Sequence, residues 1–453
     1  MQTLQSLRDG KLAGSKRLDL SCGLTRFPEE IFELADSLEI LNLSGNALSG
    51  LPDELPKLHK LRVIFCSDNR FTRLPDVLGQ CPHLEMVGFK ANQIASVPAA
   101  ALPDKLRWLI LTDNRITGLP ARLGSCMRLQ KLMLSGNRLQ SLPDEMAACT
   151  NLELLRIAAN RFEALPDWLF SLPRLAWLAY AGNPFSDACE VAAMATQPIA
   201  HIDWHALELQ HQLGEGASGV IYRARLQTAG DEAAVAVKIF KGALTSDGLP
   251  RSEKAACIAA GRHPGLIPVA GKISGHPEGT PGLVMALIDP SFRNLAGPPS
   301  LASCTRDIYP AETEFSLASA LNIACGIAAV AEHLHAQGVM HGDLYAHNIL
   351  RNEKGDCLLG DFGAASFLPN SSDFAQQDAH PAAALQRIEV RAFGCLLEEL
   401  LERCDAPVEA RDILEQLRAL QQRCDQSEPA GRPLFGEIRN TLQSLRGEAA
   451  IAR

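Results

Sequence analysis

The residues best suited to chemistry in this chain lie in two short polar stretches near position 350. Asp343 lies within the segment His341 to Asn348, five residues before Asn348, and Asp361 follows thirteen residues after Asn348. Phosphoryl transfer from a metal-bound nucleotide requires one carboxylate that orients the attacking hydroxyl, with an amide and a second carboxylate that hold the metal ion. The spacing therefore predicts this reaction, with Asp343 orienting the nucleophile and Asn348 and Asp361 binding the metal.

A glycine-rich stretch and a lysine upstream supply groups that could bind the phosphates of a nucleotide. Residues 214–220 contain three glycines and follow a segment of alternating leucines, which is typical of a strand that turns over phosphates. Lys238 ends a Val-Ala-Val-Lys sequence typical of a buried strand, and Glu253 lies fifteen residues further on. An ammonium group held by a carboxylate is a fixed positive charge, so Lys238 with Glu253 is predicted to contact the phosphates.

In order and spacing, six elements of residues 207–445 resemble those of eukaryotic-like protein kinases. They are the glycine-rich stretch, the Lys238 and Glu253 pair, a hinge after Met285, the catalytic and metal-binding residues, a helix at 389–394 and an arginine motif at 431–433. The resemblance implies a two-lobed α+β fold, ATP with Mg²⁺ or Mn²⁺ as cofactors, and catalytic roles for Asp343, Lys238 and Asn348. It also implies nucleotide contacts from Leu213, Gly214, Glu215, Gly216, Gly219, Val220, Ala236, Lys238, Glu253, Met285, Ala286 and Ile288.

The sequence also departs from the kinase pattern. Gly342 replaces the usual arginine before the catalytic aspartate, so we expect no activation through a phosphorylated loop. Residues 375–377 (Ala-Gln-Gln) occupy the place of Ala-Pro-Glu, which would leave Arg432 without its usual carboxylate partner. Tyr345 stands where Ser/Thr kinases usually have lysine, and His347 where tyrosine kinases usually have arginine.

Two further departures concern the body of this predicted domain. Glu389 replaces the usual aspartate in the helix expected to anchor the catalytic loop, and residues 289–315 form an irregular insertion after the hinge. We expect a protein kinase that acts on Ser or Thr. These differences leave two alternatives to that activity. One is a pseudokinase scaffold that recruits proteins without transferring phosphate. The other is a small-molecule phosphotransferase of the aminoglycoside type.

The N-terminal half is a repeat array. Asparagines at positions 46, 69, 92, 114, 137, 160 and 183 recur every 22 or 23 residues, each within a Leu-x-x-Leu-x-Leu-x-x-Asn-x-Leu frame. The pattern resembles the leucine-rich repeat family across about residues 15–186. It predicts a solenoid in which the frame leucines form a stacked core and each asparagine amide bonds to turn backbone.

The residues next to the second leucine of each frame should lie on the concave face of this solenoid. Many of them are apolar, whereas a purely structural solenoid would keep this face mostly polar. We therefore predict a groove that binds a protein or peptide, the alternative being that some of these side chains cover the neighbouring domain or merely tolerate exposure. The predicted contact residues are Ile40, Phe65, Met86, Trp108, Ile110, Met133, Leu154 and Trp177.

Length and composition are consistent with an α/β multidomain protein. We expect a leucine-rich repeat solenoid with an N-terminal cap at 1–186, a short junction at 187–206 and a protein-kinase-like domain at 207–447. Residues 1–200 hold 21 basic and 21 acidic residues, so the net charge of −9 falls on the C-terminal part and argues against a nucleic-acid partner. The sequence contains no apolar run long enough to suggest a membrane span.

The thirteen cysteines are scattered and never form Cys-x-x-Cys. This distribution favours neither a disulfide framework nor a zinc site. It predicts a reducing, cytoplasmic location.

Overall fold

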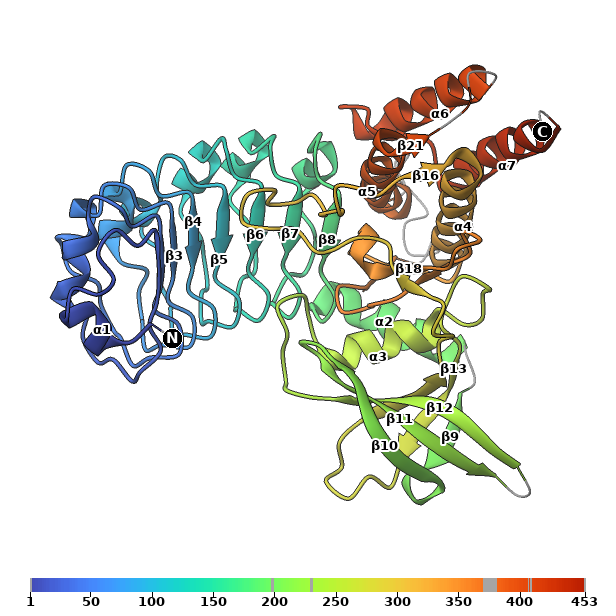
Figure 1. The fold of residues 1–453 in the computed structure, drawn as a ribbon, viewed down its shortest axis with the longest axis horizontal. Helices are drawn as coiled ribbons and strands as arrows, with labels where there is room; N and C mark the ends of the chain where they lie inside the picture. The colour runs from blue at the N-terminus through green and yellow to red at the C-terminus, as the bar shows by residue number, and fades with distance from the viewer. Residues whose placement is uncertain are drawn as a thin grey trace. The chain divides into compact units, whose positions relative to one another are not determined.

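The computed structural model describes residues 2–196, 199–228, 231–369, 381–405, 407 and 410–451. The chain divides into two compact units, Met1–Leu175 and Ala176–Arg453 (Figure 1). Of the sequence motifs named above, the triplet at residues 375–377 lies outside the described residues.

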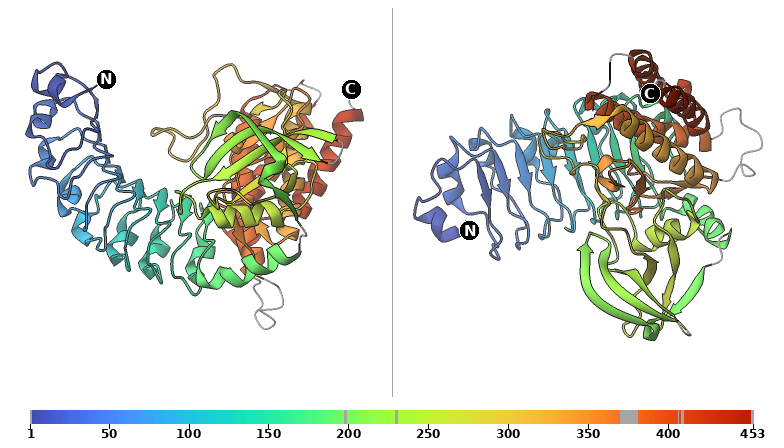
Figure 2. Two further views of the ribbon diagram at one scale, coloured as in Figure 1. Left: turned by 90° about the horizontal axis from the view of Figure 1, so that it is seen from below. Right: turned by 45° about the vertical axis from the view of Figure 1, so that its right-hand side comes forward.

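The first unit is a curved array of short parallel strands (Figure 2). Each strand pairs in register with the next along the chain. A short helix α1 (Leu4–Arg8) precedes them. The strands are β1 (Arg17–Asp19), β2 (Ile40–Asn42), β3 (Val63–Phe65), β4 (Met86–Gly88), β5 (Trp108–Ile110), β6 (Lys131–Met133) and β7 (Leu154–Arg156).

Short 3₁₀-helices return the chain between these strands. Most of them begin directly after the proline of a Leu-Pro or Val-Pro pair, where the fixed φ of proline suits an extended residue before a helix. They are η1 (Glu29–Leu34), η2 (Leu55–Lys57), η3 (Asp76–Gln80), η4 (Ala99–Ala101), η5 (Ala121–Ser125), η6 (Asp144–Ala148) and η7 (Asp167–Ser171).

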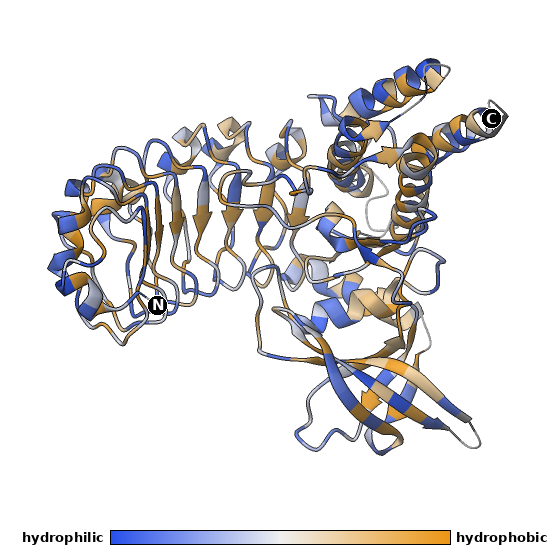
Figure 3. Ribbon diagram, viewed as in Figure 1, coloured by the Kyte–Doolittle hydropathy of each residue, from blue (hydrophilic) through white to orange (hydrophobic). Residues whose placement is uncertain are grey.

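The repeat frame produces the core of this unit as predicted. The frame leucines are almost completely buried, and Figure 3 shows hydrophobic residues along the strands. Asn69 illustrates the asparagine role, because its Oδ1 accepts from the Leu48 amide at 2.9 Å and its Nδ2 donates to the Leu43 carbonyl at 2.9 Å. Repetition of these bonds stabilises the stacked turns, and the predicted leucine-rich repeat solenoid is confirmed.

The second unit begins with the strand of the last repeat frame. Strand β8 (Trp177–Ala179) and helix α2 (Pro184–Thr196) lead into β9 (Ala200–Asp203) and η8 (Trp204–Ala206). Residues 176–181 are all nearly inaccessible to solvent within the structure. An ordered strand and helix therefore occupy most of the region between the repeat array and the predicted kinase domain.

The smaller lobe of the second unit is a six-stranded sheet in the order β10-β11-β12-β14-β13-β9. Helix α3 (Pro250–Ala259) begins with a proline at its first position, where no backbone donor is needed. The other strands are β10 (Leu207–Glu215), β11 (Gly219–Thr228), β12 (Asp231–Phe240), β13 (Val269–Ser274) and β14 (Gly282–Ala286). Strand β9 adds to the edge of this sheet, parallel to β13.

The larger lobe is mainly helical. Its helices are α4 (Leu317–Ala336), α5 (Pro381–Glu402), α6 (Arg411–Cys424) and α7 (Phe435–Ile451). Short pieces complete it: β15 (Arg293–Asn294), β16 (Phe315–Ser316), β17 (Val339–Met340), η9 (Ala346–Asn348), β18 (Ile349–Arg351), β19 (Cys357–Leu359), β20 (Ser366–Phe367), β21 (Cys404–Asp405) and η12 (Pro429–Gly431). The predicted two-lobed α+β architecture is confirmed.

Helix α4 is the one described helix that is long and apolar enough to cross a membrane. Most of its apolar residues are buried in the helical lobe, among them Leu321, Ile327 and Leu334. This helix therefore has the pattern of a core helix, which is hydrophobic around much of its circumference.

Candidate active site

The glycine-rich turn joins β10 to β11 and is closed by a bond from the Gly216 amide to the Gly219 carbonyl at 2.9 Å. A Cβ at Gly219 would lie 2.4 Å from the Ile239 carbonyl oxygen, so packing requires glycine there. A Cβ at Gly214 or Gly216 would meet nothing within 4 Å, and neither residue has a positive φ. Nothing in the fold requires glycine at these two positions, which leaves the backbone open to the close approach of a phosphate group.

The remaining predicted residues of this turn line its two strands. Leu213 is exposed, Val220 is half-buried, and Glu215 forms an exposed ion pair with Lys241. Glu215 therefore supports the turn through Lys241, the residue that follows β12.

Lys238 on β12 forms an ion pair with Glu253 on α3. Both side chains are largely buried, with exposed fractions of 13% and 2%. Burial alone would lower the pKa of Lys238, but the negative charge of Glu253 outweighs it, with a further contribution from Asp361, and the pKa is raised. Lys238 is thus held as a cation by Glu253, and Asp361 adds to the negative charge that acts on it.

The predicted adenine contacts lie on β12, on its neighbour β14 and just after β14. Ala236 is two residues before Lys238, on the same face of β12, and it pairs in register with Met285 on β14. The Ala286 amide donates to the Pro268 carbonyl at 2.9 Å, so an adenine could use only the carbonyl of Ala286. Met285, Ala286 and Ile288 are half-buried, and their contact with adenine stays a prediction.

The catalytic loop brings Asp343 and Asn348 into direct contact. The Asn348 Nδ2 group donates to the Asp343 Oδ2 at 2.8 Å and to the Asp343 carbonyl at 2.9 Å. These bonds use the amide nitrogen, so the oxygen Oδ1 is the atom of Asn348 suited to a metal ion. The loop is linked to the next segment by His341, which is fully buried and whose Nε2 lies 2.8 Å from the Gly360 carbonyl.

Asp361 has a φ of 55°, in the left-handed region that residues other than glycine seldom adopt. Its Oδ1 accepts from the Gly363 amide at 3.1 Å, and Phe362 beside it is buried against His341.

The donor set fits a divalent cation that also binds nucleotide phosphates. Within the described residues, no group of three or more His, Cys, Asp or Glu side chains could hold a metal ion alone. Mg²⁺ commonly takes only one or two protein oxygens and completes its shell with water and phosphate. Asn348 and Asp361 would hold the ion in this way.

Helix α5 anchors the catalytic loop through Glu389. Its Oε1 accepts from the Gly342 amide at 2.7 Å, and its Oε2 lies 2.7 Å from the His335 Nε2. Burial opposes the charged form of Glu389, but the bond to His335 and the amide of Gly342 outweigh it, and its pKa is lowered. Glutamate thus performs here the anchoring expected of an aspartate.

The structure explains why glycine replaces arginine at position 342. Gly342 has a φ of +72°, and a Cβ there would lie 2.5 Å from the Ala364 carbonyl oxygen and 2.7 Å from the Leu178 carbonyl oxygen. Leu178 belongs to β8, so a repeat-type strand occupies the space that a side chain at 342 would need. Sequence reasoning found the unusual glycine but missed the strand that requires it.

Trp177 is the predicted groove residue whose environment differs most from expectation. It is 1% exposed, its Nε1 donates to the Leu344 carbonyl at 3.1 Å, and its ring stacks on Tyr345 with centroids 4.1 Å apart. The prediction that Trp177 is exposed for an outside partner was therefore wrong, because the catalytic loop covers it.

The other predicted groove residues divide into two sets. Met86 and Leu154 are buried, so they offer no surface to a partner. Met86 lies between Val63 and Trp108 on the neighbouring strands, whose side chains flank it. The half-buried set that remains is Ile40, Phe65, Trp108, Ile110 and Met133.

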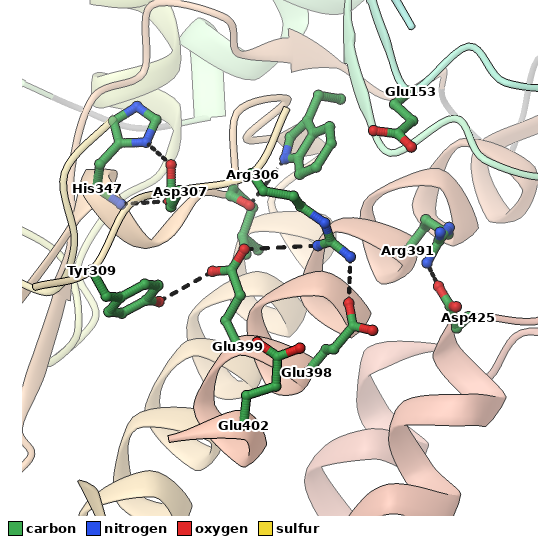
Figure 4. Close-up of polar contacts among 12 residues, drawn as sticks. Glu153, Arg306, Asp307, Tyr309, His347, Arg391, Glu398, Glu399, Glu402 and Asp425 are labelled. Atoms are coloured by element: carbon green, nitrogen blue, oxygen red, sulfur yellow. Dashed lines mark hydrogen bonds and ion pairs between the residues drawn. The ribbon is translucent and has the colours of Figure 1, made fainter. Parts of the chain in front are cut away.

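The insertion after the hinge contributes Asp307, a residue that sequence reasoning did not single out (Figure 4). Its carboxylate accepts from the His347 amide at 3.0 Å and lies 2.7 Å from the His347 Nδ1. Burial lowers the pKa of His347, but Asp307 outweighs it, with help from Asp343 and Asp361, and the pKa is raised. No pattern in residues 289–315 signals this pairing, because it joins segments forty residues apart.

Arg432 uses backbone partners. Its guanidinium donates to the Gln426 carbonyl at 3.0 Å and to the Arg387 carbonyl at 3.2 Å. Burial lowers its pKa to about 10. The arginine motif thus links α5 to the turn before α7.

Comparison with known protein families supports the assignment of a kinase domain that follows leucine-rich repeats. Residues 207–433, half of the chain, match the protein tyrosine and serine/threonine kinase family. Residues 37–58 and 127–185 match leucine-rich repeats. The chain therefore belongs to the protein tyrosine and serine/threonine kinase family and carries leucine-rich repeats before its kinase domain. Kinases of this family use ATP and a divalent metal ion.

Curated relatives include kinases of different kinds. The human tyrosine-protein kinase Srms is 28% identical over 156 residues, covering 28% of this chain and 32% of the relative. Human cyclin-dependent kinase 10 is 29% identical over 160 residues, covering 35% and 41%. A probable inactive L-type lectin-domain containing receptor kinase III.1 of Arabidopsis thaliana is 33% identical over 79 residues, covering 17% and 13%. The chain spans less than half of the length of each of these relatives.

The first prediction concerns Gly342. Gly342→Ala should lower the free energy of unfolding by about 3 kcal/mol, because it adds a methyl group against two carbonyl oxygens and a strained φ. Gly338→Ala is the control: its φ of +74° gives the same strain, but its Cβ would meet nothing within 4 Å. That control should cost only about 1 kcal/mol. Urea unfolding of both variants measures the difference, and equal losses would contradict the crowding at Gly342.

The second prediction concerns Glu399 on α5. Burial raises its pKa to about 7, and Asp307 adds to this effect although Arg306, Tyr309 and Arg403 oppose it. Because the folded pKa lies above the unfolded value of 4.5, the folded state binds the proton more tightly. The stabilisation that protonated Glu399 gives the folded state is fully present below pH 4.5 and is lost as the pH rises through 7.

Glu399→Gln should remove this loss of stability at high pH. Its side-chain oxygen can still accept the hydrogen bond from the Tyr309 hydroxyl, which lies 3.1 Å from Glu399 Oε2. The variant should exceed the parent protein in unfolding free energy by roughly 2–3 kcal/mol at pH 8. At pH 5 the difference should be much smaller. Urea midpoints at both pH values measure this. Glu398→Gln, which removes a more exposed carboxylate beside Arg306, should give no gain at pH 8.

Proposed function

We propose that this protein transfers the γ-phosphoryl group of ATP to serine or threonine hydroxyls of proteins. The observation that carries the proposal is the simultaneous presence of the buried Lys238 and Glu253 pair, the Asp343 and Asn348 contact, and the left-handed Asp361. These are the parts that a protein kinase needs for positioning and charge neutralisation. They support an active enzyme over a scaffold.

Each residue of the site has a distinct task in this proposal. Lys238, oriented by Glu253, binds the phosphates as a fixed cation. Asp343 accepts the hydrogen bond of the substrate hydroxyl and directs its oxygen toward the γ-phosphorus. Asn348 and Asp361 would hold Mg²⁺ or Mn²⁺, which when bound neutralises phosphate charge. The glycine-rich turn covers the phosphates and excludes water from them.

The choice of serine or threonine rests on His347. This residue stands where tyrosine kinases usually have arginine, and Asp307 binds both its amide and its ring. A side chain held in this way is not free to take over the role of that arginine. Phosphoamino acid analysis of the labelled product separates serine and threonine from tyrosine.

We further propose that the concave face of the repeats binds a protein partner or substrate. The half-buried residues Ile40, Phe65, Trp108, Ile110 and Met133 form an apolar series on this face. A protein segment with apolar side chains would match this series.

The free cysteines favour a reducing compartment. All thirteen lie within the described residues and none is in a disulfide. We propose a cytoplasmic location on this basis.

The third prediction tests catalysis. Purified full-length protein with radiolabelled ATP, Mg²⁺ or Mn²⁺ and a generic basic protein should label that protein. Asp343→Asn should reduce the rate at least 100-fold, because the hydroxyl loses the carboxylate that orients it. Lys238→Met should cause a comparable loss, while Lys354→Met, which removes an exposed lysine of the turn between β18 and β19, should not.

Other outcomes of this assay would select the alternatives. Label transferred to a small alcohol, such as an aminoglycoside, but not to protein would indicate a small-molecule phosphotransferase. Nucleotide binding with no transfer to any acceptor would indicate a pseudokinase scaffold.

The fourth prediction tests the repeat surface. Trp108→Ala should weaken binding to a partner that copurifies with the protein by about 2 kcal/mol, or roughly thirtyfold in Kd. Trp168→Ala is the control, because Trp168 lies in η7 on the helical side of the same repeat array. Calorimetric titration with the identified partner measures both variants. Equal affinity of Trp108→Ala and the parent protein would contradict binding at this face.

A further inference from the structure

We propose that residues 176–196, which comprise β8 and α2, hold the catalytic machinery in its working arrangement, with Trp177 as the positioning residue of the catalytic loop. The segment would take the part played elsewhere by a phosphorylated activation loop. This inference rests on the proposed phosphoryl transfer. Three separate sets of contacts carry it, one to each part of the active site that must be aligned.

The first contact fixes the backbone shortly after Asp343, at the peptide between Leu344 and Tyr345. Trp177 donates its indole N–H to the Leu344 carbonyl at 3.1 Å, and its ring is parallel to that of Tyr345 within 6°. On the other side of Asp343, the Gly342 amide is held by Glu389, and the Leu178 carbonyl leaves no room for a side chain. The backbone on both sides of Asp343 is therefore restrained, and β8 contributes to both restraints.

The second contact fixes the segment after Asp361. The Tyr180 amide donates to the Ser366 Oγ at 2.9 Å, and the Tyr180 hydroxyl donates to the Phe367 carbonyl at 2.9 Å. Tyr180 is completely buried. Ser366 and Phe367 form β20, which pairs with β17 directly before the catalytic loop. Tyr180 thus ties the start of the activation segment to the same strand region that carries Trp177.

The third contact reaches the helix that carries Glu253. Helix α2 packs against α3, as Figures 1 and 2 show. The Ser252 hydroxyl donates to the Glu190 Oε2 at 3.1 Å. Ser252 immediately precedes Glu253, the ion-pair partner of Lys238, so α2 supports α3 at the residue next to Glu253. The ion pair that orients Lys238 is therefore braced by the same segment.

These contacts explain how the site is ordered without an arginine at position 342. A phosphorylated loop aligns a kinase by forming new bonds between a phosphate and arginine side chains. Here the aligning groups are an indole, a tyrosine and a helix, all within one stretch of chain that is covalently continuous with the kinase domain. Such a segment needs no association step, since its effective concentration is high at all times.

The test compares full-length Trp177→Phe with the parent protein. Phenylalanine keeps an aromatic ring beside Tyr345 but removes the N–H donor to Leu344. We expect kcat to fall about tenfold, which is the scale of one lost hydrogen bond expressed at the transition state, with KM for ATP unchanged within about twofold. Amides of residues 342–348 should exchange hydrogen faster, measured by mass spectrometry.

Trp204→Phe is the matched control. Trp204 belongs to the same unit but packs against the apolar cluster of the smaller lobe, around Leu207 and Val235. It should change neither kcat nor exchange in residues 342–348. If Trp177→Phe fails to fold, Tyr180→Phe tests the same segment by removing one oxygen, and it should lower kcat with faster exchange of the Ser366 and Phe367 amides.

The outcomes separate this inference from the proposed function. If the parent protein transfers phosphate and Trp177→Phe matches it in kcat, or shows unchanged exchange in the catalytic loop, the positioning role is overturned. If the parent protein transfers no phosphate, the proposed function fails. The exchange comparison then decides independently whether Trp177 holds the loop.

Discussion

The absence of a side chain at Gly342 is the constraint on which the rest of the catalytic centre depends. Because no Cβ is present, the carbonyls of Leu178 and Ala364 can both approach this residue, and Glu389 can bind its amide from helix α5. Three segments that are far apart in sequence therefore meet at one backbone position. Asp343 is the next residue, so its location is set by this meeting of a strand, a helix and a loop.

Buried charges in this centre are placed for orientation, and each charge is matched by a partner. A buried ion pair such as Lys238 with Glu253 adds little net stability, because desolvation offsets most of the attraction. Its value is directional, since it fixes the ammonium group of Lys238 on Glu253. Glu389 with His335 and Asp307 with His347 follow the same principle, and each pair joins two segments around the catalytic loop.

The repeat frame serves two purposes in one chain. In the first unit, the leucines and asparagines repeat the same contacts at every turn, so each repeat is stabilised by its neighbours. In the last frame, strand β8 carries Trp177 and is followed by Tyr180, whose side chains contact the catalytic loop and the segment after Asp361. The side chains therefore decide whether a repeat frame contacts another repeat or the catalytic loop.

The sequence by itself determined the repeat architecture, the two-lobed kinase fold and the identity of the residues suited to phosphoryl transfer. These depend on local periodicity and on short spacings, such as the 23-residue asparagine recurrence or the five residues from Asp343 to Asn348, which are readable without coordinates. Only the tertiary structure decided that Trp177 is buried against the catalytic loop, that position 342 has no room for a side chain, and that Asp307 pairs with His347. These depend on contacts across forty to nearly 170 residues, where the partner is chosen by packing in three dimensions and leaves no periodic signal in the chain.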